Sequence, residues 1–272
     1  MKPSNIRLTK GRFTSLLVAL LILSSCSSVL LTGRRQLALV TDAEVLALSD
    51  SSYRAYMATA TVSKKTTQNT MVNRVGTKIA AAVETYLTQE NKLDLIQGYT
   101  WDFKLVVDTA VNAFCMPGGK IVVYEGLLPV TQSETGLAVV IGHEVAHAIA
   151  KHTNERLSQQ MATQLGLSVI GSVIPEKYAL MKAYGPAVLG IGAEYGIMLP
   201  YSRKQEYEAD QLGLIFMAMA GYDPAEALSF WSRMAAQSQN WIPEILSTHP
   251  SDEKRIANLQ KILPQAQQYY KK

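Results

Sequence analysis

One short histidine motif constrains the fold of this chain more than any other feature of its sequence. His143 and His147 lie four residues apart in the apolar segment AVVIGHEVAHAIA. On a helix this spacing places the two imidazoles about 40° apart around the axis, so both can bind one metal ion. Glu144 lies between them in angle and is placed to act as a general base on a metal-bound water. The segment therefore predicts a buried helix that holds zinc.

The residues before the motif predict where this helix begins. Thr131 and Glu134 have the spacing of a capping box, and apolar residues then recur with helical periodicity from Leu137 to Ile149. Unpaired polar groups would be costly in such an apolar helix, which argues against two histidines that merely decorate a surface.

A zinc ion that keeps one position open for water needs a third protein ligand. His152 lies about 140° around the helix from His147, which predicts a solvated or capping residue near the helix end. His249 lies beside Pro250 in a predicted loop and is compatible with the ligand role on spacing alone.

Acidic residues are the other candidates for the third ligand. On the helix predicted over 203–221, Glu206 and Asp210 share a face, whereas Glu208 points about 200° away from Glu206. One of the two carboxylates on the shared face would bind the metal while the other orients an imidazole N–H. The residues alone do not choose between these acids and His249.

Around the motif, hydrophobic periodicity predicts a mainly helical body with a small sheet. Thr41 and Glu44 form a capping box at the start of one predicted helix. The pattern changes to a period of two after Trp101, which indicates strands, and is helical again after Gly126. The predicted elements are helices over 41–58 and 71–87, strands over 103–107 and 120–124, and a turn over 116–119. The predicted fold class is α+β, in a single compact domain.

The N-terminal residues predict export from a bacterial cytosol. A basic start precedes the apolar stretch 13–23, and the sequence LSSC that follows resembles a lipoprotein signal. This pattern predicts a signal peptide over 1–25, a lipidated Cys26, a tether over 26–40 and a metallopeptidase domain over 41–272. Ser27 after the cysteine resembles the outer-membrane default of proteobacterial lipoproteins. The alternative is an uncleaved membrane anchor, which would export the body as well.

Charge and cysteine content argue against a nucleic-acid-binding protein and against a disulfide-stapled scaffold. The net charge is +4, and residues 1–25 carry Lys2, Arg7, Lys10 and Arg12 without an acid, so the body is neutral. A neutral body gives no support for nucleic-acid binding. With Cys26 lipidated, Cys115 has no partner for a disulfide and is predicted to be a small core residue.

Several motifs together resemble a known family. They are TGRRQL at 32–37, NAFCMPGGKIVVYEGL at 112–127, HEVAH at 143–147, EYEAD at 206–210 and THPSDEKRI at 248–256. This set is similar to the gluzincin family of HtpX heat-shock proteases and type I CAAX prenyl proteases, and within it to the periplasmic lipoprotein branch of the LoiP and BepA kind. The given sequence ends soon after THPSDEKRI, so we do not expect the long helical-repeat extension of the BepA kind.

The resemblance implies a zincin-like fold and a role for each motif residue. It implies one zinc per chain with His143, His147 and Glu206 as ligands and Glu144 as the catalytic base. It also implies that Asp210 orients a ligand from outside the metal's ligand set. The family's downstream histidine and arginine near the active site correspond to two further residues, His249 and Arg255.

Further roles follow as hypotheses from the expected mechanism. His249 would donate to the oxyanion of the tetrahedral intermediate, and Arg255 would pair with the acids at Glu206 and Asp210 or be solvated. The strand at 120–124, with Val122 and Val123 at its centre, would present its edge to an extended substrate, unless it is a plain core strand. Asn112 would contact the substrate backbone or simply end a strand.

These observations predict a lipid-anchored periplasmic zinc endopeptidase. The resemblance adds envelope protein quality control as its role, with unfolded or misassembled envelope proteins as substrates. The segment 175–200, rich in glycine and proline, is a candidate lid over the cleft. One alternative is a non-proteolytic assembly factor or holdase with a structural or inactive zinc site. Another is an adaptor that recruits a separate protease. Glu144 separates these alternatives from an enzyme, because a structural zinc site would not need it.

Overall fold

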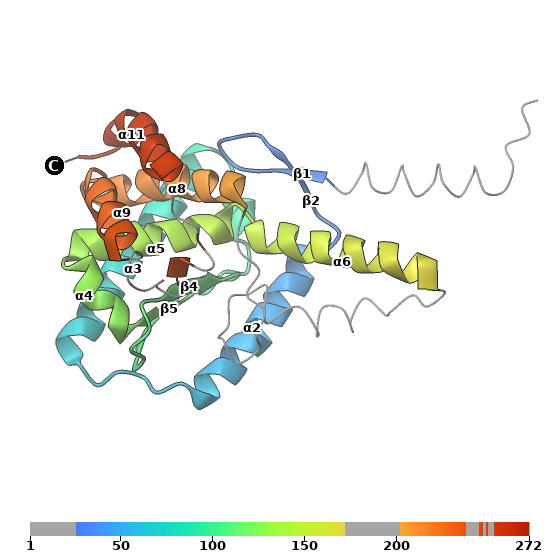
Figure 1. Cartoon of the computed structure of the whole chain (residues 1–272), viewed down its shortest axis with the longest axis horizontal. Helices are drawn as coiled ribbons and strands as arrows, with labels where there is room; N and C mark the ends of the chain where they lie inside the picture. Colours follow the sequence, from blue (N-terminus) through green and yellow to red (C-terminus); the bar gives the residue numbers. More distant parts are fainter. Residues whose placement is uncertain (1–25, 172–201, 238–244, 247–248, 250–252, 272) are drawn as a thin grey trace, which may run out of the picture.

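The computed structural model describes residues 26–171, 202–237, 245, 246, 249 and 253–271 (Figure 1). The predicted signal peptide and the predicted lid lie outside the described residues. The labelled elements are β1 (Cys26–Ser28), β2 (Arg35–Leu37), α2 (Asp42–Thr59), α3 (Thr66–Gln89), η1 (Leu93–Ile96), β3 (Asp102–Val106), β4 (Ala113–Met116), β5 (Lys120–Tyr124), η2 (Glu125–Leu127), α4 (Leu128–Thr131), α5 (Glu134–Ile149), α6 (His152–Gly171), α8 (Arg203–Met219), α9 (Glu226–Gln237) and α11 (Glu253–Gln267).

Helix α5, which carries the histidine motif, lies at the centre of the fold. Figure 1 shows it with α8 and α3 alongside and the sheet close by. Every residue from Gly136 to Ile149 is buried, which explains why the motif is surrounded by apolar residues on all sides of the helix. The sequence therefore predicted the helix correctly.

The predicted start of this helix was wrong. Its N-cap is Ser133, whose hydroxyl accepts a hydrogen bond from the backbone N–H of Gly136. Thr131 instead ends the short helix α4, where its own hydroxyl donates to the carbonyl of Leu128. The two candidate caps lie two residues apart, and the left-handed conformation of Gln132 between them separates α4 from α5.

Helices α5 and α8 cross at a pair of glycines, Gly142 and Gly213. A Cβ atom on Gly213 would lie 2.9 Å from the backbone nitrogen of His143, and one on Gly142 would lie 2.9 Å from the carbonyl oxygen of Gly213. Such separations are too short for real Cβ atoms. The glycines therefore let the two helices approach closely, which places the histidines of α5 beside the acids of α8.

We expect Gly213→Ala to weaken both the fold and the metal centre. The added methyl group pushes against α5 at His143, and overpacking of this kind costs about 1–3 kcal/mol of unfolding free energy. Urea unfolding and zinc titration would measure the two effects. Gly76→Ala is the matched control, because the atoms nearest to a Cβ there belong to the ring of Phe103, at 2.2 Å and beyond, and not to α5 at His143. Equal zinc affinity in both variants would contradict this account of the crossing.

The sheet has three strands in the order β3–β5–β4, with β5 parallel to β3 and antiparallel to β4. Leu105 and Val123 face the core formed with α3 and α5, whereas Val106 and Val122 face a second core that includes Tyr53 of α2. The sheet is therefore buried on both faces. The predicted α+β class, mainly helical with a small sheet, is confirmed. Strand β4 was not predicted, because its four residues are too few to show a period.

The segment predicted as a tether packs against the body. Strands β1 and β2 pair in antiparallel fashion. Val29, directly after β1, and Val40, shortly after β2, are each 2% exposed. The folded part of the chain thus begins before residue 41. Among the described helices, none combines the length and apolar character needed to cross a membrane.

Candidate metal centre

Helices α5 and α8 bring three buried ligand candidates to one point. His143 Nε2 and His147 Nε2 are 3.1 Å apart. Oxygens of Glu206 lie 3.3 Å from His147 Nε2 and 3.5 Å from His143 Nε2. Ligand atoms at 2.0–2.1 Å from a tetrahedral zinc lie about 3.3 Å from one another. The two imidazoles and the carboxylate therefore fit zinc in both chemistry and spacing.

His249 joins the same cluster from the C-terminal part of the chain. Its Nδ1 lies 3.2 Å from His143 Nε2 and 3.1 Å from Glu206 Oε1. The four ligand atoms all lie within 4.8 Å of one another. Its Nε2 lies 3.3 Å from Oε1 of Glu144. Both candidates for the third ligand, His249 and an acid, thus lie in the site, and His249 lies where a fourth ligand would be.

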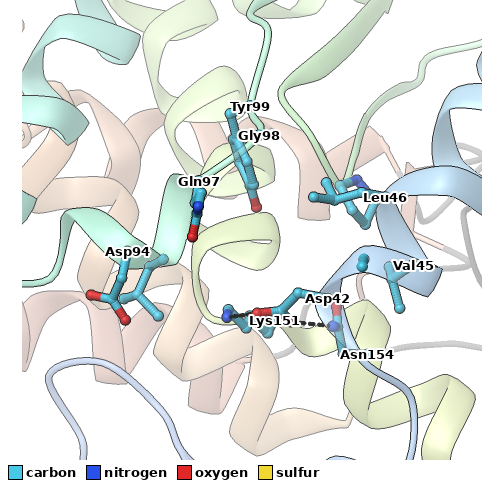
Figure 2. A pocket seen from close by; sticks show the side chains of 12 residues that line it. Asp42, Val45, Leu46, Asp94, Gln97, Gly98, Tyr99, Lys151 and Asn154 are labelled. Carbon is cyan, nitrogen blue, oxygen red and sulfur yellow. Dashed lines mark hydrogen bonds and ion pairs between the residues drawn. The ribbon is translucent and has the colours of Figure 1, made fainter.

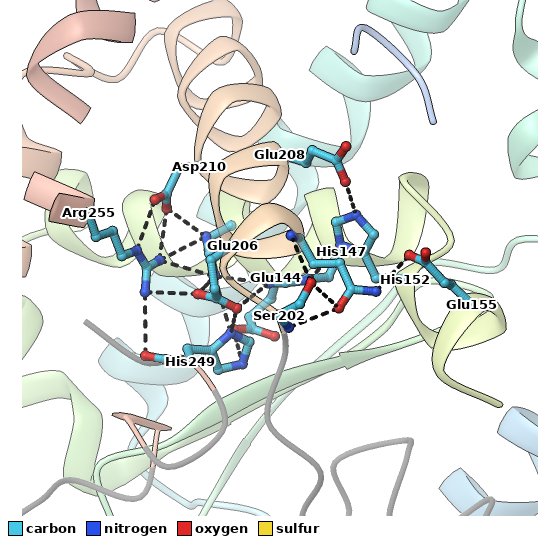
Figure 3. A network of polar contacts seen from close by, with 12 residues as sticks. Glu144, His147, His152, Glu155, Ser202, Glu206, Glu208, Asp210, His249 and Arg255 are labelled. Atoms are coloured by element: carbon cyan, nitrogen blue, oxygen red, sulfur yellow. Dashed lines mark hydrogen bonds and ion pairs between the residues drawn. The ribbon is translucent and has the colours of Figure 1, made fainter. Parts of the chain in front are cut away.

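Arg255 and Asp210 pair with each other and contact the ligand candidates Glu206 and His143 (Figure 3). The guanidinium of Arg255 donates to both carboxylate oxygens of Asp210, at 2.8 and 2.9 Å, and lies 2.9 Å from an oxygen of Glu206. Its Cζ lies 3.6 Å from the ring centroid of Trp231. Oδ1 of Asp210 lies 3.0 Å from Nδ1 of His143. The predicted contacts of both residues are present, and Arg255 is buried rather than solvated.

The charges of this cluster shift its pKa values in opposite directions. Burial would raise the pKa of Glu206, but His249 and Arg255 hold it well below its usual range. Burial and Arg255 oppose a proton on His143, but hydrogen bonds to Asp210 and Glu206 raise its pKa to about 9. Burial lowers the pKa of His147 well below its usual range. Binding of a metal would displace the proton of His143, so we expect the affinity for the metal to fall as the pH falls.

The prediction for His152 was wrong. Lys151 adopts a left-handed conformation with φ of 57°, so α5 ends and α6 begins at His152 in a new direction. His152 is fully buried, with Nδ1 2.8 Å from Nδ1 of His147 and Nε2 3.0 Å from an oxygen of Glu208. A helical wheel that continues past Ile149 cannot find this contact, and no other sequence signal marks it.

Glu208 is the second residue that sequence analysis left outside the site. It points away from Glu206, as predicted, but its carboxylate is buried against His152, Arg34 and Thr32. Burial would raise its pKa, but these three partners lower it to about 2. Glu208 is therefore a buried carboxylate that contacts His152, which in turn contacts the ligand candidate His147.

The turn at Lys151 borders a cavity of about 340 Å³ (Figure 2). Lys151 forms an ion pair with Asp42 at the start of α2, and Asn154 donates a hydrogen bond to the same carboxylate at 2.9 Å. The cavity lies between these groups and the segment around Gly98 and Tyr99. Its charged groups thus tie the α5–α6 turn to α2.

The predicted substrate-binding strand edge was wrong. Strand β5 hydrogen-bonds to β3 on one side and to β4 on the other, and Val122 and Val123 are fully buried. In the described part of the sheet the edge strands are β3 and β4, and residues 61–63 bond to the outer side of β3. Asn112 precedes β4 and accepts a hydrogen bond at its Oδ1 from the backbone N–H of Ala113, at 2.9 Å. Cys115 of β4 is buried, as predicted.

Comparisons with known proteins agree with this geometry. A family model described as Peptidase family M48 matches residues 66–263. Mitochondrial metalloendopeptidase OMA1 of Schizosaccharomyces pombe is 39% identical over 169 residues, which cover 61% of this chain and 48% of that protein. Human metalloendopeptidase OMA1 is 32% identical over 248 residues, which cover 87% of this chain and 45% of that protein. The β-barrel assembly-enhancing protease of Escherichia coli K12 is 30% identical over 162 residues, which cover 57% of this chain and 33% of that protein. The chain thus spans about half or less of these relatives.

Proposed function

This chain belongs to peptidase family M48, and we propose that it is a zinc-dependent endopeptidase that cleaves bacterial envelope proteins while tethered to a membrane by lipid. Its metal centre is of the HExxH…E type found in M48 zinc metalloendopeptidases, with ligands His143, His147 and Glu206. The observation that carries the proposal is the buried carboxylate of Glu144 beside this centre, which a purely structural zinc site would not need.

The residues around the centre divide the work of peptide hydrolysis. Zinc, when bound, lowers the pKa of a water toward 7 and polarises the scissile carbonyl. Glu144 takes a proton from the attacking water and passes it to the leaving amine. Asp210 accepts from Nδ1–H of His143, at 3.0 Å, which would leave Nε2 of the ring to bind the metal. Arg255 holds Asp210 in this orientation.

His249 has two candidate roles, oxyanion donor and fourth zinc ligand, and it cannot fill both at once. As a donor it would stabilise the negative charge that develops on the substrate oxygen. In the described arrangement, however, its Nδ1 lies at ligand spacing from His143 and Glu206. Four protein ligands are typical of closed structural zinc sites, whereas catalytic sites keep three. The donor role therefore requires His249 to leave this position.

An extended substrate would bind along β4. The backbone N–H of Tyr124 donates to the carbonyl of Asn112, so residues 113 and 115 point their backbone groups away from β5. Strand β4 packs against α5, the helix that carries Glu144, which supports a position of this edge near the catalytic carboxylate. Main-chain pairing of this kind gives weak sequence preference. Asn112 would exchange its contact with Ala113 for one with substrate.

The cellular role is inferred from the N-terminus and from one relative. The lipoprotein-like signal over 1–25 with Cys26 supports a lipid anchor facing the periplasm, in the outer rather than the inner membrane. The relative from Escherichia coli is named for enhancing β-barrel assembly. We extend this to quality control of unfolded or misassembled envelope proteins. The alternative remains an assembly factor that uses the zinc site without proteolysis.

Casein hydrolysis with control of the metal tests the proposal. We expect the purified protein to contain one zinc per chain and to cleave casein. A chelator should abolish cleavage, and added zinc should restore it, because Glu144 has no activated water without the metal. Folded protein without zinc, or cleavage that resists the chelator, would exclude a zinc peptidase. Zinc without cleavage would favour the assembly factor.

A further inference from the structure

A chain of polar contacts leads from the zinc ligand His147 away from the metal. Its Nδ1 lies 2.8 Å from Nδ1 of His152, and Nε2 of His152 lies 3.0 Å from Oε2 of Glu208 (Figure 3). With Nε2 of His147 facing the other ligands, its Nδ1 carries the proton and donates to His152. The remaining N–H of His152 then donates to Glu208. Each donor in this chain thus has one acceptor.

The chain of contacts ends at Arg34, which lies just before β2. Arg34 binds Glu208 through two hydrogen bonds, from Nε at 2.8 Å and from Nη2 at 2.9 Å. It binds Glu155 of α6 through two more, both at 2.7 Å. Thr32 donates a further hydrogen bond to Glu208, at 2.8 Å. One guanidinium thus fixes two carboxylates from different helices, which its planar fork of donors allows.

Burial makes this arrangement sensitive to the loss of Arg34. Glu155 is 4% exposed, Glu208 is 5% exposed and His152 is fully buried. Two buried carboxylates side by side are costly unless a cation pairs with them. Without Arg34 the carboxylate of Glu208 would lose two of the hydrogen bonds that hold it toward His152 and would keep only the one from Thr32 beside that of His152 itself. The ring of His152 would then lose its fixed orientation, and His147 would lose a hydrogen-bond acceptor in a fixed position.

We propose that Arg34 is a positioning residue of the zinc centre, acting through Glu208 and His152 on His147. The segment predicted as a tether would thus complete the metal site from outside the HExxH…E motif. This inference deepens the proposed function, on which it rests for the identity of the metal. Residues that orient a metal ligand from outside fix its tautomer and its basicity, and losing them costs about 10–100-fold in metal affinity or activity.

Zinc affinity, measured by competition with a chromophoric chelator, tests this role without any substrate. We expect Arg34→Gln to weaken zinc binding about tenfold. Glu208→Gln should have a similar effect, and the double variant should be no weaker than either, because both act through the same contacts. Arg34→Lys should fall between the wild type and Arg34→Gln, since an ammonium cannot form the paired hydrogen bonds. Arg54→Gln, which breaks an exposed ion pair in α2, is the control and should bind zinc normally.

The outcomes distinguish positioning from mere support of the fold. If Arg34→Gln lowers the thermal stability but binds zinc as tightly as the wild type, the proposal is overturned. If Arg34→Gln fails to fold, Thr32→Val keeps the guanidinium. It removes one hydrogen bond to Glu208 and a longer one, at 3.4 Å, from the backbone N–H of Arg34, and it should still weaken zinc binding about two- to threefold. Unchanged zinc affinity in that variant would also overturn the proposal. Failure of the wild type to cleave casein would instead count against the proposed function.

Discussion

Replacement of Glu144 by glutamine is expected to abolish proteolysis while leaving one zinc per chain. Glutamine keeps the size of the side chain and an oxygen that can face His249, 3.3 Å away in the wild type. It cannot take a proton from water, and a positioned general base contributes about 10²–10⁴-fold to a rate. Casein hydrolysis and metal content by mass spectrometry, measured side by side with the wild type, give both quantities.

The control for this variant is Glu90→Gln, an exposed residue after α3. It should match the wild type in both measurements. Loss of zinc from Glu144→Gln would mean that this carboxylate helps to hold the metal. Cleavage at the wild-type rate would mean that another group is the base. If the wild type and Glu144→Gln both contain zinc but neither cleaves casein, the result would support the assembly factor or the adaptor.

Replacement of Arg255 by methionine is expected to have the largest effect on stability, and the effect should depend on the metal. Arg255 is 1% exposed and pairs with the carboxylates of Asp210 and Glu206, which are also buried. Removing one partner from a buried ion pair costs about 3–5 kcal/mol, because it leaves an uncompensated charge. In the metal-free protein the two carboxylates would retain only His143 and the other imidazoles as partners. Bound zinc would supply positive charge at Glu206 and reduce the deficit.

Urea unfolding of the metal-free and zinc-loaded proteins measures this difference. Arg233→Met is a matched control, because Arg233 also pairs with a carboxylate, that of Glu226, but both side chains are about one quarter exposed, at 26% and 27%. That variant should lose about 1 kcal/mol or less, with or without zinc. An equal deficit for Arg255→Met in both states, or one below about 1 kcal/mol, would show that Arg255 does not balance the charge of the metal site.

The zinc helix shows which parts of this protein can be predicted from the sequence. His143, Glu144 and His147 lie within one helix, so their relative positions follow from the helical repeat, and apolar periodicity identifies the helix. The sharing of a face by Glu206 and Asp210 follows in the same way. Which of them binds the metal did not follow from the residues alone. The family resemblance implied Glu206, and the spacing of the ligand atoms agrees with it.

The sheet was predictable only in part. The strand at 120–124 was found with its bounds, since its three central residues, Ile121, Val122 and Val123, are apolar and β-branched. Its place in the sheet was not, because hydrogen-bonding partners are chosen by the packing of the whole domain and leave no local signal. The strand proved to be central, so it cannot offer its edge to a substrate, and β3 and the short strand β4 are the edge strands of the described sheet.

The sequence by itself indicated the chemistry proposed for this protein, namely a zinc-binding helix, a candidate general base and a second helix with acids. Only the tertiary structure decided what surrounds that chemistry. The left-handed turn at Lys151 redirects the chain so that His152 contacts His147. The close crossing at Gly142 and Gly213 joins the two helices. Arg34 reaches a carboxylate 174 residues away. The physical reason is that helix geometry acts over a few residues, whereas contacts between distant segments depend on how the whole chain packs.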